Sequence, residues 1–395
     1  MHFTSYVTFS VTQDSGRFSL FTLWTLLSMG YGTQLTGTKM FTSHRSTRLL
    51  MIDTHYIIDL EVARAAYKTW TSLFPKVTPY YAVKCNPDPL LIQTLSDLGA
   101  GFDCASPAEL DIVKTKKVIY ANPCKRPADI LYASKNGVTR TTFDSVCELE
   151  KMAIYAPNME LIMRIRADDP TAVCTLGNKY GAGESDWYTL IERAKELNLV
   201  ITGVSFHVGS GARSARAYAD AIYTASRAID VLKEYGYNPQ LVDIGGGFSS
   251  SMDIEDAAEC INDALKETGL DSYEVIAEPG RFFAENTATL YTPVIGTKDG
   301  AVTIDESLYG AFNCILMDHA EPEPVVEEDA ELESVTLFGS TCDGADIIAR
   351  NISLPVGLKV GDVLTWNRMG AYTMAATTNF NGIPFNQRRI VYVNA

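Results

Sequence analysis

Short apolar runs alternate with longer amphipathic stretches between residues 77 and 281. Most of the short runs are rich in Val, Ile, Tyr and Phe, a composition typical of buried strands. The predicted strands are Pro79–Lys84, Gly101–Ala105, Val118–Ala121, Gly137–Phe143, Leu161–Ile165, Gly203–His207, Leu241–Ile244 and Val275–Ala277. Helical patterns separate them, for example at Asp88–Leu98, Ala128–Asn136, Glu184–Leu197 and Ala215–Tyr235. Eight units in succession, without a long break, favour a closed (β/α)8 TIM-like barrel over a doubly wound open sheet.

The pattern changes after residue 288. Short strand-like runs now alternate with Gly, Pro and acidic patches, at Thr289–Ile295, Val335–Phe338, Val363–Trp366 and Ile390–Val393. This predicts a C-terminal all-β domain at 284–395 behind a barrel at 67–283. The segment 51–66, strand-like over Met51–Asp59, is expected to add a strand to the β domain.

The charge balance restricts the possible partners. The chain contains 33 Lys and Arg against 48 Asp and Glu, a formal net charge of −15. Because phosphate backbones are bound by clustered basic residues, this balance argues against nucleic acid as a partner and favours small cationic ligands. No run of 18 or more apolar residues occurs, so the sequence predicts no transmembrane helix and no membrane partner.

Residues 1–50 form a different kind of sequence. They carry four basic residues and one acidic residue, and they are rich in Ser and Thr. Three interpretations fit this leader: a dispensable extension before an alternative start at Met40 or Met51, an organelle transit peptide, or a secretory or anchor segment.

The eight cysteines form no CxxC pair and no cluster with histidine. A structural zinc site is therefore not expected, and no metal is assigned. Several cysteines lie in apolar strand-like runs, where buried free thiols are common. We expect a reducing, cytoplasmic location for the part of the chain that follows the leader.

Polar residues end several predicted barrel strands, where barrel enzymes place their active sites. Lys84 ends the first strand. A lysine at the inner mouth of a barrel is desolvated, which predicts a lowered pKa and an amine free for Schiff-base chemistry. The alternative is a lysine that extends from the strand end into solvent.

Glycine-rich loops follow three successive strands, at Gly209–Gly211, Gly245–Gly247 and Gly280. Backbone N–H groups of such loops can converge on a phosphate, and Arg281 adds a positively charged fork. Glu278 at the barrel mouth is suited to pair with a protonated pyridine nitrogen, and His207 to stack on a flat ring. Each residue alone also fits a buried structural role; together with Lys84 they indicate a pyridoxal 5'-phosphate (PLP) site.

At this point the sequence resembles a known family. The motifs are Tyr81-Ala-Val-Lys84, Gly101-Phe-Asp-Cys104, Ser205-Phe-His207, Asp243-Ile-Gly-Gly-Gly247, Ala277-Glu-Pro-Gly-Arg281, Thr341-Cys-Asp-Gly344 and Gly370-Ala-Tyr-Thr373. In this order, from about residue 53 to 394, they resemble the eukaryotic-type ornithine decarboxylases. The resemblance implies an alanine-racemase-like PLP barrel followed by a C-terminal β domain.

The resemblance also implies residue roles. Lys84 would hold the cofactor through a Schiff base, Glu278 would pair with the ring nitrogen, and His207 would stack on the ring. The other implied cofactor contacts are Asp103, Arg164, Ser210, Gly245, Gly246, Gly247, Gly280, Arg281 and Tyr372, with Glu109 as a supporting residue. The implied substrate contacts are Asp318, Asp343, Tyr309 and Phe380. Cys342 would return a proton to the substrate carbon, from the other subunit of a homodimer with shared active sites.

The implied reaction is decarboxylation of L-ornithine to putrescine and CO2. Lysine, arginine or another diamino acid remains an alternative substrate, since one methylene gives only modest discrimination. Met317, Ser340 and Ala345 depart from the usual family residues and bear on this choice. An inactive regulatory relative, similar to the antizyme inhibitors, is disfavoured because the cofactor residues are all present. The sequence does not decide whether an antizyme binds.

Overall fold

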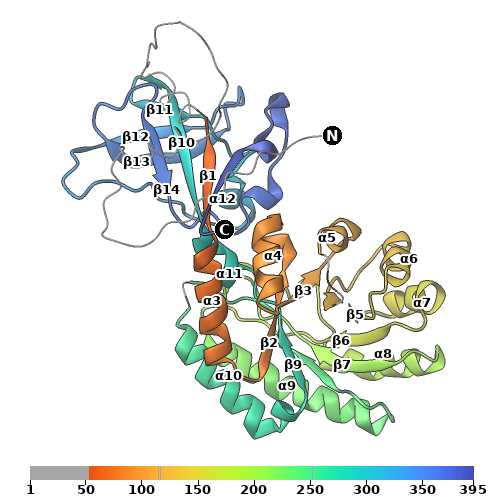
Figure 1. Cartoon of the computed structure of the whole chain (residues 1–395). Coiled ribbons are helices and arrows are strands. Elements are labelled where there is room, and N and C mark those ends of the chain that lie inside the picture. The colour runs from red at the N-terminus through yellow and green to blue at the C-terminus, as the bar shows by residue number, and fades with distance from the viewer. Residues whose placement is uncertain (1–52, 114, 116, 251) are drawn as a thin grey trace, which may run out of the picture.

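The computed structural model describes residues 53–113, 115, 117–250 and 252–395. The leader at 1–50 lies outside these residues. Figure 1 shows two lobes: a barrel surrounded by helices, and a smaller lobe made mainly of strands. Across the described residues, no helix has both the length and the apolar character needed to cross a membrane.

The first lobe is a closed barrel of parallel strands, which confirms the predicted fold class. Its strands are β2 (Val77–Ala82), β3 (Gly101–Cys104), β4 (Val118–Tyr120), β5 (Arg140–Phe143), β6 (Glu160–Arg164), β7 (Ile201–Ser205), β8 (Leu241–Asp243) and β9 (Glu274–Ala277). The barrel closes because β9 also pairs with β2. All eight strands overlap the predicted runs, and β5 begins three residues later than expected.

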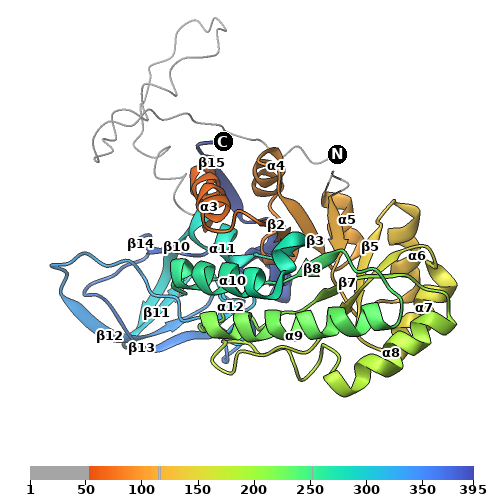
Figure 2. The same cartoon turned by 90° about the horizontal axis from the view of Figure 1, so that it is seen from below.

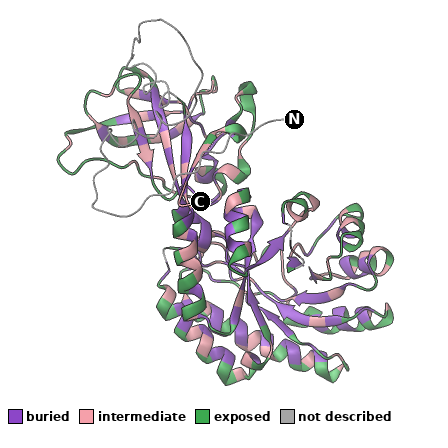
Figure 3. Ribbon diagram, viewed as in Figure 1, coloured by how far each residue is buried: buried purple, intermediate pink, exposed green. Residues whose placement is uncertain are grey.

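Helices cover the outside of this barrel (Figure 2). They are α3 (Leu60–Leu73), α4 (Pro89–Asp97), α5 (Pro107–Ile112), α6 (Pro127–Lys135), α7 (Val146–Tyr155), α8 (Glu184–Glu196), α9 (Ala215–Glu234) and α10 (Ile254–Thr268). The short α11 (Arg281–Ala284) follows β9 at the mouth of the barrel. Apart from α5, which has no fully buried residue, the inner faces of the covering helices and the barrel strands are buried, whereas the outer faces of those helices are exposed (Figure 3). Local signals set their ends: α5 begins at Pro107 because the Ser106 hydroxyl accepts a hydrogen bond from the Glu109 N–H at 3.3 Å.

Strand alternation gives the barrel an apolar floor below a polar rim. One compact cluster of buried residues comes from five different strands: Tyr80, Ile119, Ile162, Leu241 and Ile276. Side chains two residues apart on a strand lie on the same face. The residues two positions further along β6 and β8, and just past β9, are Arg164, Asp243 and Glu278. Because these charged residues lie two positions beyond the barrel-filling residues on the same strands, their side chains face the mouth of the barrel.

The second lobe is a seven-stranded sheet with the order β13-β12-β11-β10-β1-β15, in which β14 also pairs with β10. Its strands are β1 (His55–Asp59), β10 (Ala288–Lys298), β11 (Ala301–Ile304), β12 (Leu332–Phe338), β13 (Ile347–Pro355), β14 (Val363–Trp366) and β15 (Arg389–Val393). The short α12 (Asn313–Met317) precedes Asp318. Strand β1 pairs with both β10 and β15. Helix α3 begins at Leu60, so residues 60–66 of the segment predicted as strand are helical.

The two lobes are joined beside Lys84. The Asn86 side chain donates to the Gly370 carbonyl at 2.8 Å, and the Tyr372 N–H donates to the Cys85 carbonyl at 2.9 Å. The Tyr392 hydroxyl donates to the buried Asp88 carboxylate at 2.5 Å. These contacts fix the segment after β2 against the β lobe.

Two glycines with similar backbone angles allow a test of close packing. Gly245 (φ +67°) follows β8, and an added Cβ would lie 2.1 Å from the Phe206 carbonyl oxygen. Gly269 (φ +72°) ends α10 and has open space around it. We expect Gly269→Ala to cost about 1–2 kcal/mol of unfolding free energy, the left-handed penalty alone. Gly245→Ala should cost about 3–4 kcal/mol, because overpacking is added.

Denaturant unfolding of both variants measures this difference. If the two variants lose the same amount of unfolding free energy, that result would contradict the close approach of the loops after β7 and β8.

Candidate active site

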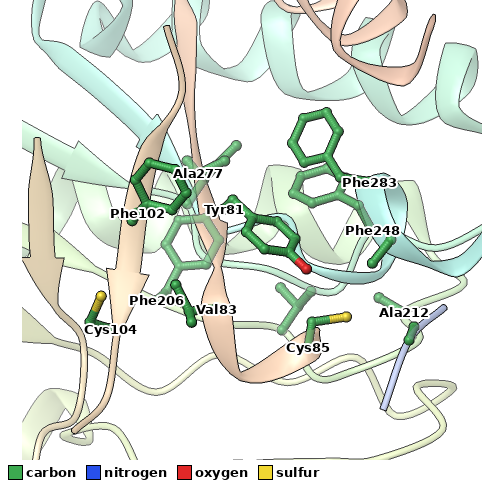
Figure 4. Packing of buried hydrophobic residues seen from close by; sticks show 14 of the residues in the cluster. Tyr81, Val83, Cys85, Phe102, Cys104, Phe206, Ala212, Phe248, Ala277 and Phe283 are labelled. Carbon is green, nitrogen blue, oxygen red and sulfur yellow. The ribbon is translucent and has the colours of Figure 1, made fainter. Parts of the chain in front are cut away.

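The predicted site residues are anchored by apolar neighbours. Lys84 follows Val83, Asp103 follows Phe102, His207 follows Phe206, and Glu278 follows Ala277. All four apolar residues are buried in one hydrophobic cluster (Figure 4). Rigid packing of each preceding residue therefore restricts where the next, polar side chain lies.

Lys84 lies in the short 3-10 turn Val83–Cys85, just after β2. Its Nζ forms an ion pair with the buried carboxylate of Asp103. Its side chain keeps 39% of its surface exposed, so a ligand can reach the amine. Desolvation opposes the charge on Lys84, but Asp103 and Glu278 outweigh it and raise the pKa of Lys84. The expectation of a lowered pKa was wrong, because two carboxylates face the amine.

Glu278 and Asp103 each bury an oxygen atom without a hydrogen-bond partner among the described residues. The atoms are Glu278 Oε1 and Asp103 Oδ1. Burial, followed by repulsion from Asp243 and Asp103, raises the pKa of Glu278 well above its usual value. An unpartnered acceptor of this kind is costly unless a donor reaches it. Glu278 is therefore suited to a ligand that brings an N–H group into the barrel mouth.

Asp243 is a third buried acid that the sequence analysis gave no role. It lies at the end of β8, where its Oδ1 accepts the Gly245 N–H at 2.9 Å. Burial raises its pKa to about 7. A signal for it exists in the sequence, since Asp243 stands two residues beyond the inward-facing Leu241.

His207 is a neutral imidazole. Desolvation, with smaller contributions from Arg164 and Lys84, lowers its pKa well below the usual range. Its Nδ1 accepts the Gly209 N–H at 3.0 Å, which assigns the ring proton to Nε2. A Cβ at Gly246 would lie 2.9 Å from Nε2, so the absence of a side chain there keeps space for the ring.

Arg164 and Glu109 lie near these groups. The Arg164 guanidinium lies 5.0 Å from the ring centre of Tyr180. Glu109 accepts the Ala105 N–H at 2.6 Å, and burial raises its pKa. The position of Tyr180 had no signal in the sequence, because the segment between β6 and α8 lacks a regular pattern.

The residues predicted to hold phosphate surround Arg281. Its Nη2 lies 3.3 Å from Ser210 Oγ, and its guanidinium lies 5.0 Å from the ring centre of Tyr372. The same Nη2 contacts both carboxylate oxygens of Asp318, at 2.7 and 2.8 Å. Gly280 directly precedes it, with its Cβ position 2.9 Å from the Cys85 side chain. From the sequence, Arg281 was expected to bind phosphate and Asp318 to bind substrate, and no contact between them was predicted.

The glycine loops also pack on each other. A Cβ at Gly247 (φ +109°) would lie 2.5 Å from the Gly209 carbonyl oxygen. The Gly247 carbonyl accepts the Ala212 N–H at 3.1 Å. Glycine at Gly245 and Gly247 is therefore required by the fold itself, whether or not the loops also contact a phosphate.

A second group lies on the β lobe. Tyr309 stacks on Phe380 with ring centres 4.2 Å apart, and its hydroxyl donates to Asp343 at 2.5 Å. This hydrogen bond lowers the pKa of Asp343. Cys342 is exposed, and its N–H donates to the Asn381 side chain at 3.1 Å. These contacts do not connect the second group to the residues around Lys84 within the chain.

The first group fits PLP. Lys84 offers a reachable amine, Glu278 an unpartnered acceptor for a ring nitrogen, and Arg281 and Ser210 donors for a phosphate. Within the described part of the chain, no cluster of three His, Cys, Asp or Glu residues has the arrangement of a metal site. The fold and the site together define a barrel-fold PLP-dependent enzyme.

Comparison with known proteins agrees with this class. Residues 60–285 match the family model of the pyridoxal-dependent decarboxylases, over their pyridoxal binding domain. The chain belongs to this family, and its cofactor is PLP. Its relatives place it with the eukaryotic-type ornithine decarboxylases, as the sequence motifs had implied.

Three similar proteins show the range of activities. Mouse ornithine decarboxylase is 41% identical over 374 residues, which cover 86% of this chain and 80% of that protein. Antizyme inhibitor 2 of Xenopus laevis is 40% identical over 371 residues, covering 86% and 81%. The solved arginine decarboxylase of Paramecium bursaria Chlorella virus has a TM-score of 0.82 and 39% identity, covering 88% and 97%.

The raised pKa of Asp243 predicts a pH-dependent stability. The folded protein disfavours ionised Asp243, so this destabilisation grows as the pH rises from 3.8 to about 7 and is absent at lower pH. Asp243→Asn should therefore raise the free energy of unfolding by about 2–4 kcal/mol at pH 8 and change it little near pH 4. Denaturant titrations at the two pH values measure this.

Asp169 provides a control of opposite sign. Burial opposes its charge, but hydrogen bonds from Thr171, Ser214 and Arg213 prevail and lower its pKa. Asp169→Asn should destabilise the protein at pH 8, and the loss should fade only as the pH falls below 3.8. A stability gain for Asp243→Asn that is equal at both pH values would contradict its raised pKa.

Proposed function

We propose that this protein catalyses the PLP-dependent decarboxylation of L-ornithine to putrescine and CO2. The observation that carries the proposal is the group of Lys84, Asp103 and Glu278. It combines a partly exposed lysine, a buried acid paired with it, and a second buried acid whose Oε1 has no hydrogen-bond partner among the described residues. The 41% identity with mouse ornithine decarboxylase supports the choice of ornithine.

When bound, PLP supplies an electron sink for the pair left by the departing CO2. Lys84 would provide the amine that holds the cofactor, and Glu278 would accept a hydrogen bond from its ring nitrogen. His207, whose Nδ1 is fixed by the Gly209 N–H, would offer its neutral ring for stacking. Arg281, Ser210 and Tyr372, with the backbone of the glycine loops, would hold the phosphate.

Substrate binding relies on two carboxylates. Asp318 and Asp343 attract the distal ammonium of a diamino acid, and the acidic surface of the molecule steers such cations toward it. Asp343 stays ionised because Tyr309 donates to it. Tyr309 and Phe380 offer a flat apolar wall for the methylene chain.

The working enzyme is a homodimer with shared active sites. Cys342 is exposed and Asp343 half-buried, and their described contacts do not include the Lys84 group of their own chain. Leu316 and Met317 of α12, in the same lobe, expose 58% and 74% of their surface. A second subunit that covers this face would place Cys342 near the partner's cofactor, where its thiol returns a proton to the substrate carbon.

Two alternatives have specific support. The similarity to a viral arginine decarboxylase, together with Met317, Ser340 and Ala345, keeps other basic amino acids open. Similarity to antizyme inhibitor 2 suggests a regulatory relative, but Lys84, Arg164 and the other cofactor residues are all present. Eight unpaired cysteines support a reducing, cytoplasmic location.

The first experiment is an absorbance spectrum of the purified protein, followed by CO2 release from ornithine, lysine and arginine. We expect bound-cofactor absorbance and the highest kcat/KM for ornithine. Lys84→Ala should reduce activity by at least about a thousandfold. If activity is highest on lysine or arginine, that amino acid takes the place of ornithine as the assigned substrate. A protein with no activity on any of the three would overturn the proposal.

A mixing experiment tests the shared sites. Lys84→Ala and Cys342→Ala proteins, each impaired alone, should recover about a quarter of wild-type activity when mixed, because half the dimers are mixed and each has one intact site. The control mixes Lys84→Ala with Glu278→Ala. Both changes affect the barrel side, so no intact site forms. Absence of recovery in the first mixture would contradict sharing.

A further inference from the structure

The ion pair between Arg281 and Asp318 connects two subsites that the proposed function treats separately. Arg281 belongs to α11, at the mouth of the barrel, and Asp318 follows α12 in the β lobe. Their side chains are only 14% and 11% exposed. We propose that this pair couples cofactor binding to substrate binding: a phosphate at Arg281 and a distal ammonium at Asp318 strengthen each other's binding. The inference rests on the proposed function.

Both partners are held in place by the fold. The Asp318 N–H donates to the Cys314 carbonyl at 3.0 Å, which ties it to the end of α12. Arg281 is held between Ser210 and the ring of Tyr372. Because neither group can withdraw easily, a ligand that binds one of them also changes the electrostatic environment of the other.

The geometry sets the sign of the coupling. A single nitrogen, Nη2, contacts both oxygens of Asp318, which leaves the other guanidinium donors for a phosphate. An anion bound there repels Asp318 and competes for its counter-charge, so Asp318 attracts an ammonium more strongly. An ammonium at Asp318 in turn screens its carboxylate from the phosphate. Linkage requires both effects to have the same size.

Asp343 provides a matched control. It is the other carboxylate proposed to bind the distal ammonium, but its partners are the Tyr309 hydroxyl and the Ala345 N–H. Neutralising Asp343 should therefore weaken substrate binding without changing the affinity of Arg281 for the phosphate. Neutralising Asp318 should change both the substrate affinity and the phosphate affinity.

The experiment measures release of PLP from the holoenzyme, as loss of bound-cofactor absorbance after dilution. Asp318→Asn should lower the PLP dissociation constant at least about threefold, because a negative charge near the phosphate is removed. Asp343→Asn should leave it unchanged. Both variants should raise the KM for ornithine. If Asp318→Asn does not fold, Asp318→Ser is measured in its place.

A pair of amines tests the reciprocal effect in the wild-type protein. Putrescine and butylamine present the same amine, but only putrescine has a distal ammonium. Putrescine should slow PLP release more than butylamine, and Asp318→Asn should abolish the difference. Cadaverine and pentylamine are run alongside, so that a lysine-specific enzyme would still show the effect.

Two results would overturn the inference: PLP binding that is unchanged or weaker in a folded Asp318→Asn protein, or equal effects of the diamines and monoamines on wild-type PLP release. Either result would leave the proposed function intact if the protein binds PLP and releases CO2 from ornithine. A protein that does not bind PLP would instead refute the proposed function.

Discussion

Buried negative charge is the constraint on which this site depends. Asp103, Asp243 and Glu278 bring three carboxyl groups together at the mouth of one barrel, largely out of water. Such groups stay ionised only when cations and hydrogen bonds compensate the lost solvation. Lys84 and Arg164 supply the positive charge, and the remaining imbalance is visible as raised pKa values and unpartnered oxygens. A protonated heteroaromatic ring is the kind of ligand that would relieve it.

The surrounding structure encloses these charged groups in a small space and excludes water from them. The apolar floor made by Tyr80, Ile162 and Ile276 closes the barrel below it. Glycine loops bring the backbone after β7 and β8 close to the group, where side chains would clash. The β lobe contributes Tyr372 and Asp318 at the rim. The site therefore belongs to the junction between the two lobes, and neither lobe alone holds all of its residues.

Much of this arrangement could be predicted from the sequence. The spacing of apolar runs located all eight barrel strands, and the polar residues at their ends made Lys84, His207 and Glu278 candidates for the site. Those predictions depend only on local pattern and on the rule that parallel strands end at one rim. Strands β11 and β13 were missed because Ala301–Ile304 is short and because polar residues interrupt Ile347–Pro355.

What the sequence could not give depends on contacts between distant segments. The pKa of Lys84 was predicted in the wrong direction because the effect of Asp103 and Glu278 on it is set by three-dimensional proximity. The meeting of Arg281 with Asp318 likewise joins elements of different lobes. Pattern and composition report which groups a chain contains, whereas charge coupling depends on which of them become neighbours.

The position of β1 has a consequence for how the chain is made. This strand lies between β10 and β15, and His55 pairs with Arg389, one of the last residues of the chain. During synthesis, β1 emerges before the barrel, yet its neighbours appear only after the whole barrel has been translated. Contacts of such long sequence separation form late. The barrel can fold while synthesis continues, but the β sheet, and with it the β-lobe side of the candidate site, is completed only when β15 has left the ribosome.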